Sequence, residues 1–161
     1  MKNKILFCAI LLMTMTVLSC AQNKGSKIRI IRTERSIEMI AAEGHKQIRD
    51  YELASVGKMT RQDTDARTDL TQQFKKQKGI ELLNDITKTY FGINSALFVF
   101  FISQQGELEA LVMSFPGENE GDTKKFPDKK LKKAFHLIVN HIDFEPWTGS
   151  AKYQSFSILS K

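Results

Sequence analysis

The sequence contains only two cysteines, Cys8 and Cys20, and both lie near the N-terminus. Residues 21–161 therefore have no thiol with which to form an internal disulfide, so the fold depends on packing. The chain also lacks a Gly-x-Ser-x-Gly elbow, a phosphate-binding loop and an apolar run of the roughly 20 residues that a relaxed transmembrane helix needs. These absences disfavour enzyme classes that carry a recognisable motif, although a site assembled from distant residues leaves no such trace.

The segment Met1 to Ser19 has the pattern of a secretory signal. Lys2 and Lys4 form a positively charged start, and Ile5 to Leu18 is an apolar stretch that no stop-transfer pattern follows. We therefore expect residues 1–19 to be removed on export. The remaining residues 20–161 suit one domain with a sizeable core.

The apolar segment ends in Val17-Leu18-Ser19-Cys20, which resembles the lipobox of bacterial lipoproteins. That pattern has leucine three positions before the cysteine and then small residues, so Val17 and Leu18 depart from it and Ser19 matches it. The resemblance implies that Cys20 is lipidated and that two or three acyl chains hold the protein at a membrane. The alternatives are an uncleaved helical anchor and a secreted chain with a free Cys20.

Residues just after Cys20 carry sorting information in such lipoproteins. Ala21 stands where aspartate would favour the inner membrane, so the resemblance favours the outer membrane. Residues 21–27 lack the acidic cluster of surface-exported lipoproteins of the Bacteroidota, so we expect the protein to face the periplasm. The chain resembles the small uncharacterised lipoproteins of that group, with a signal at 1–19, a lipidated tether at 20–27 and one domain at 28–161.

The charge of the exported chain is mildly basic. Without Lys2 and Lys4, 22 of the 24 basic residues remain against 18 acidic residues, a net charge of +4. Export argues against nucleic acid as the partner. Basic residues cluster after the anchor, where they could contact anionic head groups or form the solvated face of an N-terminal strand. They are Lys24, Lys27, Arg29, Arg32 and Arg35.

Apolar periodicity in the first third of the domain predicts strands. Residues 27–33 begin an extended pattern. The runs 37–42 and 48–54 suit a hairpin, although the second run equally allows a short helix.

The period then changes to that of a helix. Apolar residues three or four apart predict a helical region from about Asp65 to Phe91, bent near Gly79 and ended by Gly92. Thr64 or Asp63 is the expected N-cap.

The strand signal in Ala96 to Ser103 is the strongest in the chain. Its two alternating sets of side chains are both apolar, so we expect both faces to be covered and place the strand centrally in a sheet. A turn at Gly106, with positive φ, leads into a second arm that ends at Phe115. Residues 116–127 form a polar loop that we expect to be mobile.

The C-terminal region predicts a helix and a last strand. Asp128 is the expected N-cap of a helix through Ile142, with an apolar stripe packed on the sheet and lysines opposite. Residues 152–160 predict a strand toward one edge of the sheet.

Few residues have the spacing of a metal or cofactor site. His136 and His141 are five residues apart on one predicted helix, which turns their side chains about 140° from each other. Asp63, Asp65 and Asp69 lack the glycine and terminal glutamate of a calcium loop. We expect no metal and no cofactor.

The leading hypothesis is a non-enzymatic, lipid-anchored binding or accessory protein, with Trp147, Tyr153 and Phe156 as candidate binding residues. The rival is an envelope enzyme acting on glycan or peptide, with a site assembled from residues such as His136, Glu145 and Trp147. The indole of Trp147 could stack on a sugar ring or fill the core.

The segments of residues 96–161 resemble the C-terminal domain of TonB-type energy transducers. A strand, a glycine turn and a second strand at 97–115 precede the helix at 128–142, the aromatic-proline segment 144–154 and the final strand. The resemblance implies a sheet edge that accepts an extended strand of an envelope protein. The chain lacks the transducers' proline-rich spacer, so energy coupling is not implied. We expect a single α+β domain, an antiparallel sheet with helices packed on it; a generic sheet of this kind is the alternative to shared ancestry.

Overall fold

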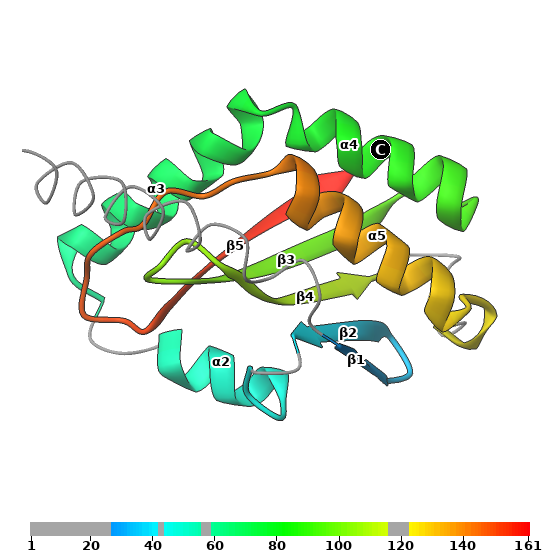
Figure 1. Ribbon diagram of the computed structural model, residues 1–161, viewed down its shortest axis with the longest axis horizontal. Coiled ribbons are helices and arrows are strands. Elements are labelled where there is room, and N and C mark those ends of the chain that lie inside the picture. The colour runs from blue at the N-terminus through cyan, green and yellow to red at the C-terminus, as the bar shows by residue number, and fades with distance from the viewer. Residues whose placement is uncertain (1–26, 42–43, 56–58, 116–122) are drawn as a thin grey trace, which may run out of the picture.

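The computed structural model describes residues 27–41, 44–55, 59–115 and 123–161. These residues form one α+β domain around a five-stranded antiparallel sheet with strand order β1-β2-β4-β3-β5, which confirms the predicted fold class (Figure 1). The strands are β1 (Ile28–Arg32), β2 (Ser36–Ala41), β3 (Ala96–Ser103), β4 (Leu108–Ser114) and β5 (Tyr153–Ser160).

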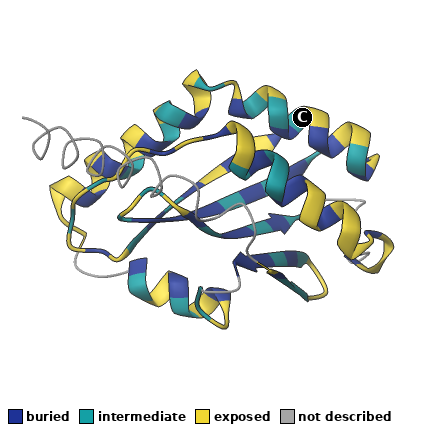
Figure 2. Ribbon diagram, in the orientation of Figure 1, coloured by how far each residue is buried: buried dark blue, intermediate teal, exposed yellow. Residues whose placement is uncertain are grey.

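Helices lie on both faces of this sheet. The larger face carries α3 (Arg61–Lys76), α4 (Gly79–Asp85), the π-helical turn η1 (Ile86–Phe91) and α5 (Asp128–His141), and α2 (Ile48–Ser55) lies on the opposite face (Figure 1). A short 3-10 turn, η3 (Thr123–Lys125), precedes α5. The strands are mostly buried and the outer sides of the helices are exposed (Figure 2).

Strand β3 is covered fully on one face and partly on the other, where Leu97 and Val99 are half-buried, so the prediction from its two apolar sets holds only in part for the second face. Phe100 points into the larger core, where its ring centroid lies 4.9 Å from that of Phe74 and 4.8 Å from that of Phe156. Phe101 belongs to a smaller cluster with Ile48 and Tyr51 of α2. β3 pairs with β4 and β5, so it lies inside the sheet, but the central strand is β4 and not β3 as predicted. β5 lies at one edge, as predicted.

The predicted hairpin of residues 37–42 and 48–54 is wrong. The hairpin is β1–β2, with Ile28 opposite Ala41, and residues 48–55 form α2. Ile48, Tyr51 and Ser55 are the buried residues of α2, and this spacing is that of one helical face. Strand alternation would have paired Tyr51 with Leu53, but the helix leaves Leu53 63% exposed.

The long helical region follows the prediction except at its start. It breaks before Gly79 and ends at Gly92, whose φ is 64°. Helix α3 begins at Arg61, and its N-cap is Thr60 rather than Asp63 or Thr64. Asp63 is instead the third residue of the helix and completes a capping box with Thr60.

The break between α3 and α4 makes Gly79 a sensitive position. A Cβ at Gly79 would lie 2.5 Å from ring carbons of the fully buried Phe74. We expect Gly79→Ala to lower the free energy of unfolding by about 1–3 kcal/mol, because the ring has no free space to enter. Lys78→Gly is the matched control, since Lys78 has φ 59° and glycine should relieve that backbone strain. Denaturant unfolding compares them; equal stability of Gly79→Ala and the wild type would contradict this packing.

Helix α5 also begins differently from the prediction. Pro127 is its N-cap and Asp128 its first residue, so the predicted cap at Asp128 is wrong by one position. The Asp128 carboxylate instead accepts a hydrogen bond of 2.5 Å from Arg32 of β1. The apolar stripe of α5 is buried as predicted, with Val139 partly so. Residues 116–122 of the predicted loop lie outside the described residues.

The predicted signal segment, Cys20 and most of the predicted tether also lie outside the described residues. Among the helices that the structure describes, none is long and apolar enough to cross a membrane. The buried core runs from Ile28 to Ile158, so a chain of residues 21–161 contains every element described here.

Candidate functional site

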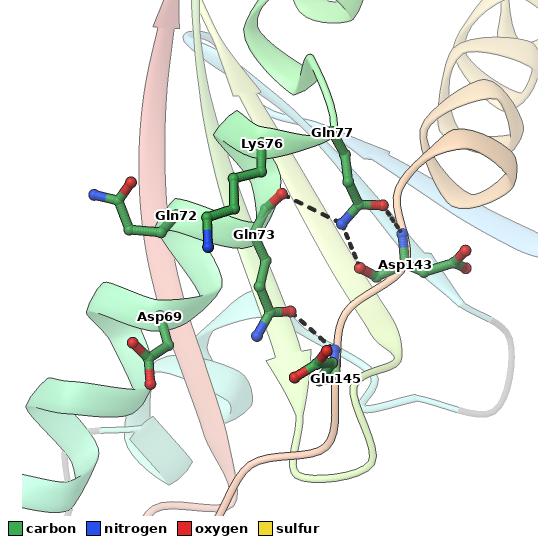
Figure 3. Close-up of a pocket in the computed structure, with 7 residues that line it drawn as sticks. All are labelled: Asp69, Gln72, Gln73, Lys76, Gln77, Asp143 and Glu145. Atoms are coloured by element: carbon green, nitrogen blue, oxygen red, sulfur yellow. Dashed lines mark hydrogen bonds between the residues drawn. The ribbon is translucent and has the colours of Figure 1, made fainter.

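A polar groove runs between helix α3 and the extended segment 142–148 that follows α5 (Figure 3). Its volume is about 390 Å³. Every side chain that lines it is polar or charged, and most are exposed. The lining residues are Asp69, Gln72, Gln73, Lys76, Gln77, Asp143 and Glu145.

Two glutamines one helical turn apart fix the wall of the groove. The Gln77 side chain accepts a hydrogen bond from the backbone N–H of Asp143 at 2.9 Å and donates to the Asp143 carbonyl at 2.6 Å. The Gln73 side chain accepts from the backbone N–H of Glu145 at 2.9 Å. The amides thus supply the hydrogen bonds that a neighbouring strand would otherwise give to this segment.

This pair of contacts predicts site-specific changes in amide exchange. Replacing Gln77 with alanine should speed hydrogen exchange at the Asp143 amide and leave Glu145 slow, because each amide has its own glutamine acceptor. Gln73→Ala should do the reverse, which makes each variant the control for the other. NMR-detected exchange measures both. Unchanged exchange at Asp143 in Gln77→Ala would contradict the contact.

The groove continues along α3 toward its N-terminus. A second hollow of about 310 Å³ shares Asp69, Gln73 and Glu145 with the first and adds Asp65 and Trp147 to the lining. Trp147 is half-buried and is the only tryptophan of the chain. The two hollows together form one groove, which we call the α3 groove.

Hydrogen bonds join Trp147, which lines the groove, to the turn between β3 and β4. Its indole N–H donates to the Ser103 carbonyl at 2.6 Å, and its backbone N–H donates to the Gln104 carbonyl at 3.0 Å. These bonds orient the ring, while part of it lines the groove. The ring therefore packs partly on the core and partly faces the groove, and its stacking on a sugar ring stays a prediction.

The buried carboxylate of Asp63 fixes the chain that follows segment 142–148, at Ser150 and Ala151. Asp63 is fully buried at the start of α3 and accepts hydrogen bonds from Thr60 N–H at 2.8 Å, Thr60 Oγ1 at 2.7 Å and Ser150 Oγ at 2.7 Å. The Ala151 N–H and the Gln154 side-chain amide also donate to it. Hydrogen bonds from Thr60 and Ser150 hold the pKa of Asp63 well below its usual range, so the group is ionised at neutral pH. Asp63 thereby joins α3 to the chain entering β5.

The charge of the α3 groove is predominantly negative. Asp65, Asp69, Asp143 and Glu145 line it and are exposed, whereas Lys76 is its one lysine. Exposed carboxylates keep contact with water and can bind cationic or hydroxyl-bearing ligands without a large desolvation cost.

The predicted binding residues Trp147, Tyr153 and Phe156 are not brought together. Phe156 is buried in the larger core, and Tyr153 lies on the opposite face of β5. The Tyr153 ring centroid lies 4.8 Å from that of Tyr51, in an aromatic cluster under α2. Burial and the nearby Glu109 raise the pKa of Tyr51 and of Tyr153. Only Trp147 of the three lines the α3 groove.

The residues of the rival enzyme hypothesis are divided as well. Glu145 and Trp147 both line the α3 groove, whereas His136 is half-buried on α5 beside Phe135. His141 is exposed, and its Nδ1 lies 2.7 Å from the Leu137 carbonyl. In the part of the chain that the structure describes, no group of three His, Cys, Asp or Glu side chains is placed to hold a metal ion.

Two residues of the N-terminal basic cluster contact other parts of the domain. The Arg29 guanidinium donates to the His45 carbonyl. The Arg32 guanidinium donates to the Phe126 carbonyl at 2.8 Å, besides its ion pair with Asp128. Both side chains therefore make contacts within the domain. Whether the basic cluster also contacts anionic head groups stays one of the two alternatives from the sequence.

Comparison with solved structures gives a structural likeness. No family model matches the sequence, and no curated protein matches it. A crystal structure of a DUF5043 family protein from Bacteroides uniformis is similar at 12% sequence identity, over 86% of this chain and 92% of that chain, with a TM-score of 0.38.

Proposed function

We propose that this chain is a lipid-anchored, non-enzymatic binding protein of the cell envelope, facing the periplasm, which takes up an extended polar ligand in the α3 groove. The signal-like segment and the lipobox resemblance at Cys20 support the proposed location at the cell envelope. The observation that carries the binding role is that the side chains of the groove fall into two sets. Gln73 and Gln77 fix its wall, and exposed charged side chains remain available to a ligand.

The ligand chemistry follows from the charges and shape of the groove. Four carboxylates against one ammonium group favour a ligand with positive charge. The groove follows one side of α3 from Gln62 to Gln77, so it fits an extended chain better than a compact molecule. We therefore expect a basic peptide segment of another envelope protein to bind here.

Trp147 provides the test, because the only tryptophan of the chain lines the groove. Titration with a six-residue peptide of alternating lysine and alanine should change the Trp147 emission in a saturable way. The peptide with glutamate in place of lysine should have no effect. The double variant Asp143→Asn and Glu145→Gln should weaken binding at least about tenfold.

The matched control is the double variant Asp50→Asn and Glu81→Gln, which removes the same charge outside the groove lining. It should bind the basic peptide like the wild type. Equal effects of the two peptides, or equal weakening in the two double variants, would overturn a charge-selective groove. Cleavage of the peptide, or of a chitin oligosaccharide tested in parallel, would instead favour the alternative, an envelope enzyme acting on peptide or glycan.

The edge of the sheet supports a second route to an envelope partner. β5 has a single neighbour, β3, in the described sheet, and Leu159 on β5 is 48% exposed. An edge strand with free backbone groups can accept an extended peptide by strand addition. A photo-crosslinking residue at Ser157 of β5 should capture a strand-added partner, and one at Glu145 should capture a groove-bound partner, so cells expressing each variant distinguish the two routes.

A further inference from the structure

Helix α5 begins with a concentration of lysines on its outer surface. Lys129, Lys130, Lys132 and Lys133, which we call the lysine face, are all exposed. The only acidic residue in this half of the helix, Asp128, is paired with Arg32. Within the part of the chain that the structure describes, none of the four lysines forms an ion pair. The lysine face therefore has positive charge that no ion pair among the described residues neutralises.

The lysine face also has an apolar floor. A hollow of about 390 Å³ is lined by Lys129, Lys130, Lys133, Thr89 and Tyr90. The Lys133 ammonium lies 5.3 Å from the centroid of the Tyr90 ring. Lysine stems and a half-buried tyrosine ring thus lie at the surface, with the ammonium groups around them. Side chains of this amphipathic kind suit the boundary between lipid head groups and water.

We propose that the lysine face lies on the anionic head groups of the membrane that anchors the chain. This proposal rests on the proposed lipid anchor at Cys20 and adds an orientation to it. The tether of residues 21–27 spans at most about 25 Å when fully extended, so an anchored domain stays close to the bilayer. A surface that carries several unneutralised lysines is then attracted to anionic lipids, and each lysine strengthens the attraction about fivefold.

This orientation replaces the one that the sequence suggested. Arg29 and Arg32 follow the tether directly, but their guanidinium groups bond to the His45 carbonyl and to Asp128. The ion pair of Arg32 with Asp128 also neutralises the acidic residue that begins α5. The arginines of β1 therefore make contacts within the domain, and the lysines of α5 contact the lipid.

Vesicle binding tests the lysine face without the anchor. Residues 21–161 contain every described element and lack Cys20, so their binding does not depend on acylation. This chain should sediment with vesicles of 70% phosphatidylcholine and 30% phosphatidylglycerol, but not with pure phosphatidylcholine. Raising the salt to 0.5 M should release it, because salt screens the attraction. Replacing Lys129, Lys130 and Lys133 together with glutamine should weaken binding roughly 100-fold.

The matched control replaces Lys46, Lys75 and Lys152 with glutamine, which removes the same charge from exposed positions elsewhere. It should retain most of the binding. Equal loss of binding in the two triple variants would overturn the proposed membrane contact of the lysine face. Absence of binding to anionic vesicles would overturn it as well, and it is the result expected if an acidic protein were the partner. Either result leaves acylation of Cys20 untouched, since acylation is measured on the full chain in cells.

Discussion

Replacing Asp63 with alanine should lower the thermal unfolding midpoint by more than about 5 °C. The carboxylate is fully buried and accepts hydrogen bonds from Thr60, Ser150, Ala151 and Gln154. Truncation leaves the buried donors of Ala151 and Gln154 without this acceptor, and it removes the capping box of α3. The segment that enters β5 then loses its connection to α3.

Asp65→Ala is the matched control, because Asp65 lies two residues away on the same helix and is exposed. Its midpoint should stay within about 1–2 °C of the wild type. Calorimetry or circular dichroism measures both variants. Similar midpoints for Asp63→Ala and Asp65→Ala would show that the buried network does not stabilise the fold.

The same carboxylate makes the protein sensitive to acid. The pKa of Asp63 is lower in the folded chain than its value of about 3.9 in an unfolded chain. Its stabilising contribution is therefore complete above about pH 4 and is lost as the pH falls below that value. Asp63→Asn should show a shallower fall in stability between about pH 4 and pH 2. Urea unfolding at several pH values gives the slopes, and parallel slopes would contradict a depressed pKa.

Replacing Phe100 with alanine should lower the free energy of unfolding by about 3–5 kcal/mol. The ring is fully buried at the centre of the larger core, where Phe156 stacks on it at an interplanar angle of 6° and Phe74 contacts it. The contacting residues come from α3 and β5, so the cavity would weaken the sheet and its helical layer together. Denaturant unfolding measures the loss.

Leu159→Ala is the control for Phe100→Ala, since Leu159 lies on the edge strand β5 and is 48% exposed. Its substitution should cost less than about 1 kcal/mol. A loss at Phe100 no larger than that at Leu159 would contradict the placement of β3 inside the sheet.

Local patterns were sufficient to predict the elements whose side chains alternate clearly. Ala96–Ser103 is apolar on both alternating sets. The structure buries one face of β3 fully and the other in part, since Phe101 is buried there and Leu97 and Val99 are half-buried. Gly92 and Gly106 adopt the positive φ expected at a helix end and a turn. The run 48–54 was ambiguous because Ile48 and Tyr51 also fit a helix, and packing on Phe101 decides the outcome. Local periodicity does not contain that tertiary contact.

The α3 groove could not be predicted in the same way. Gln73 and Gln77 have the spacing of one helical face, but glutamines at this spacing occur on any solvated helix. Their role depends on the segment at Asp143 and Glu145, which is distant in sequence. Asp63 was identified only as a possible cap, because its partners Ser150 and Ala151 also come from the C-terminal region. Of the candidate binding residues, Trp147 alone lines the groove.

The proposed envelope location of the protein and the proposed orientation of its lysine face both depend on acylation of Cys20. Metabolic labelling of cells with an alkyne analogue of palmitate tests it directly, with the full chain, Cys20→Ala and the control Cys8→Ala compared. We expect label on the full chain and on Cys8→Ala, and none on Cys20→Ala. Equal labelling of Cys20→Ala and the wild type would contradict the anchor.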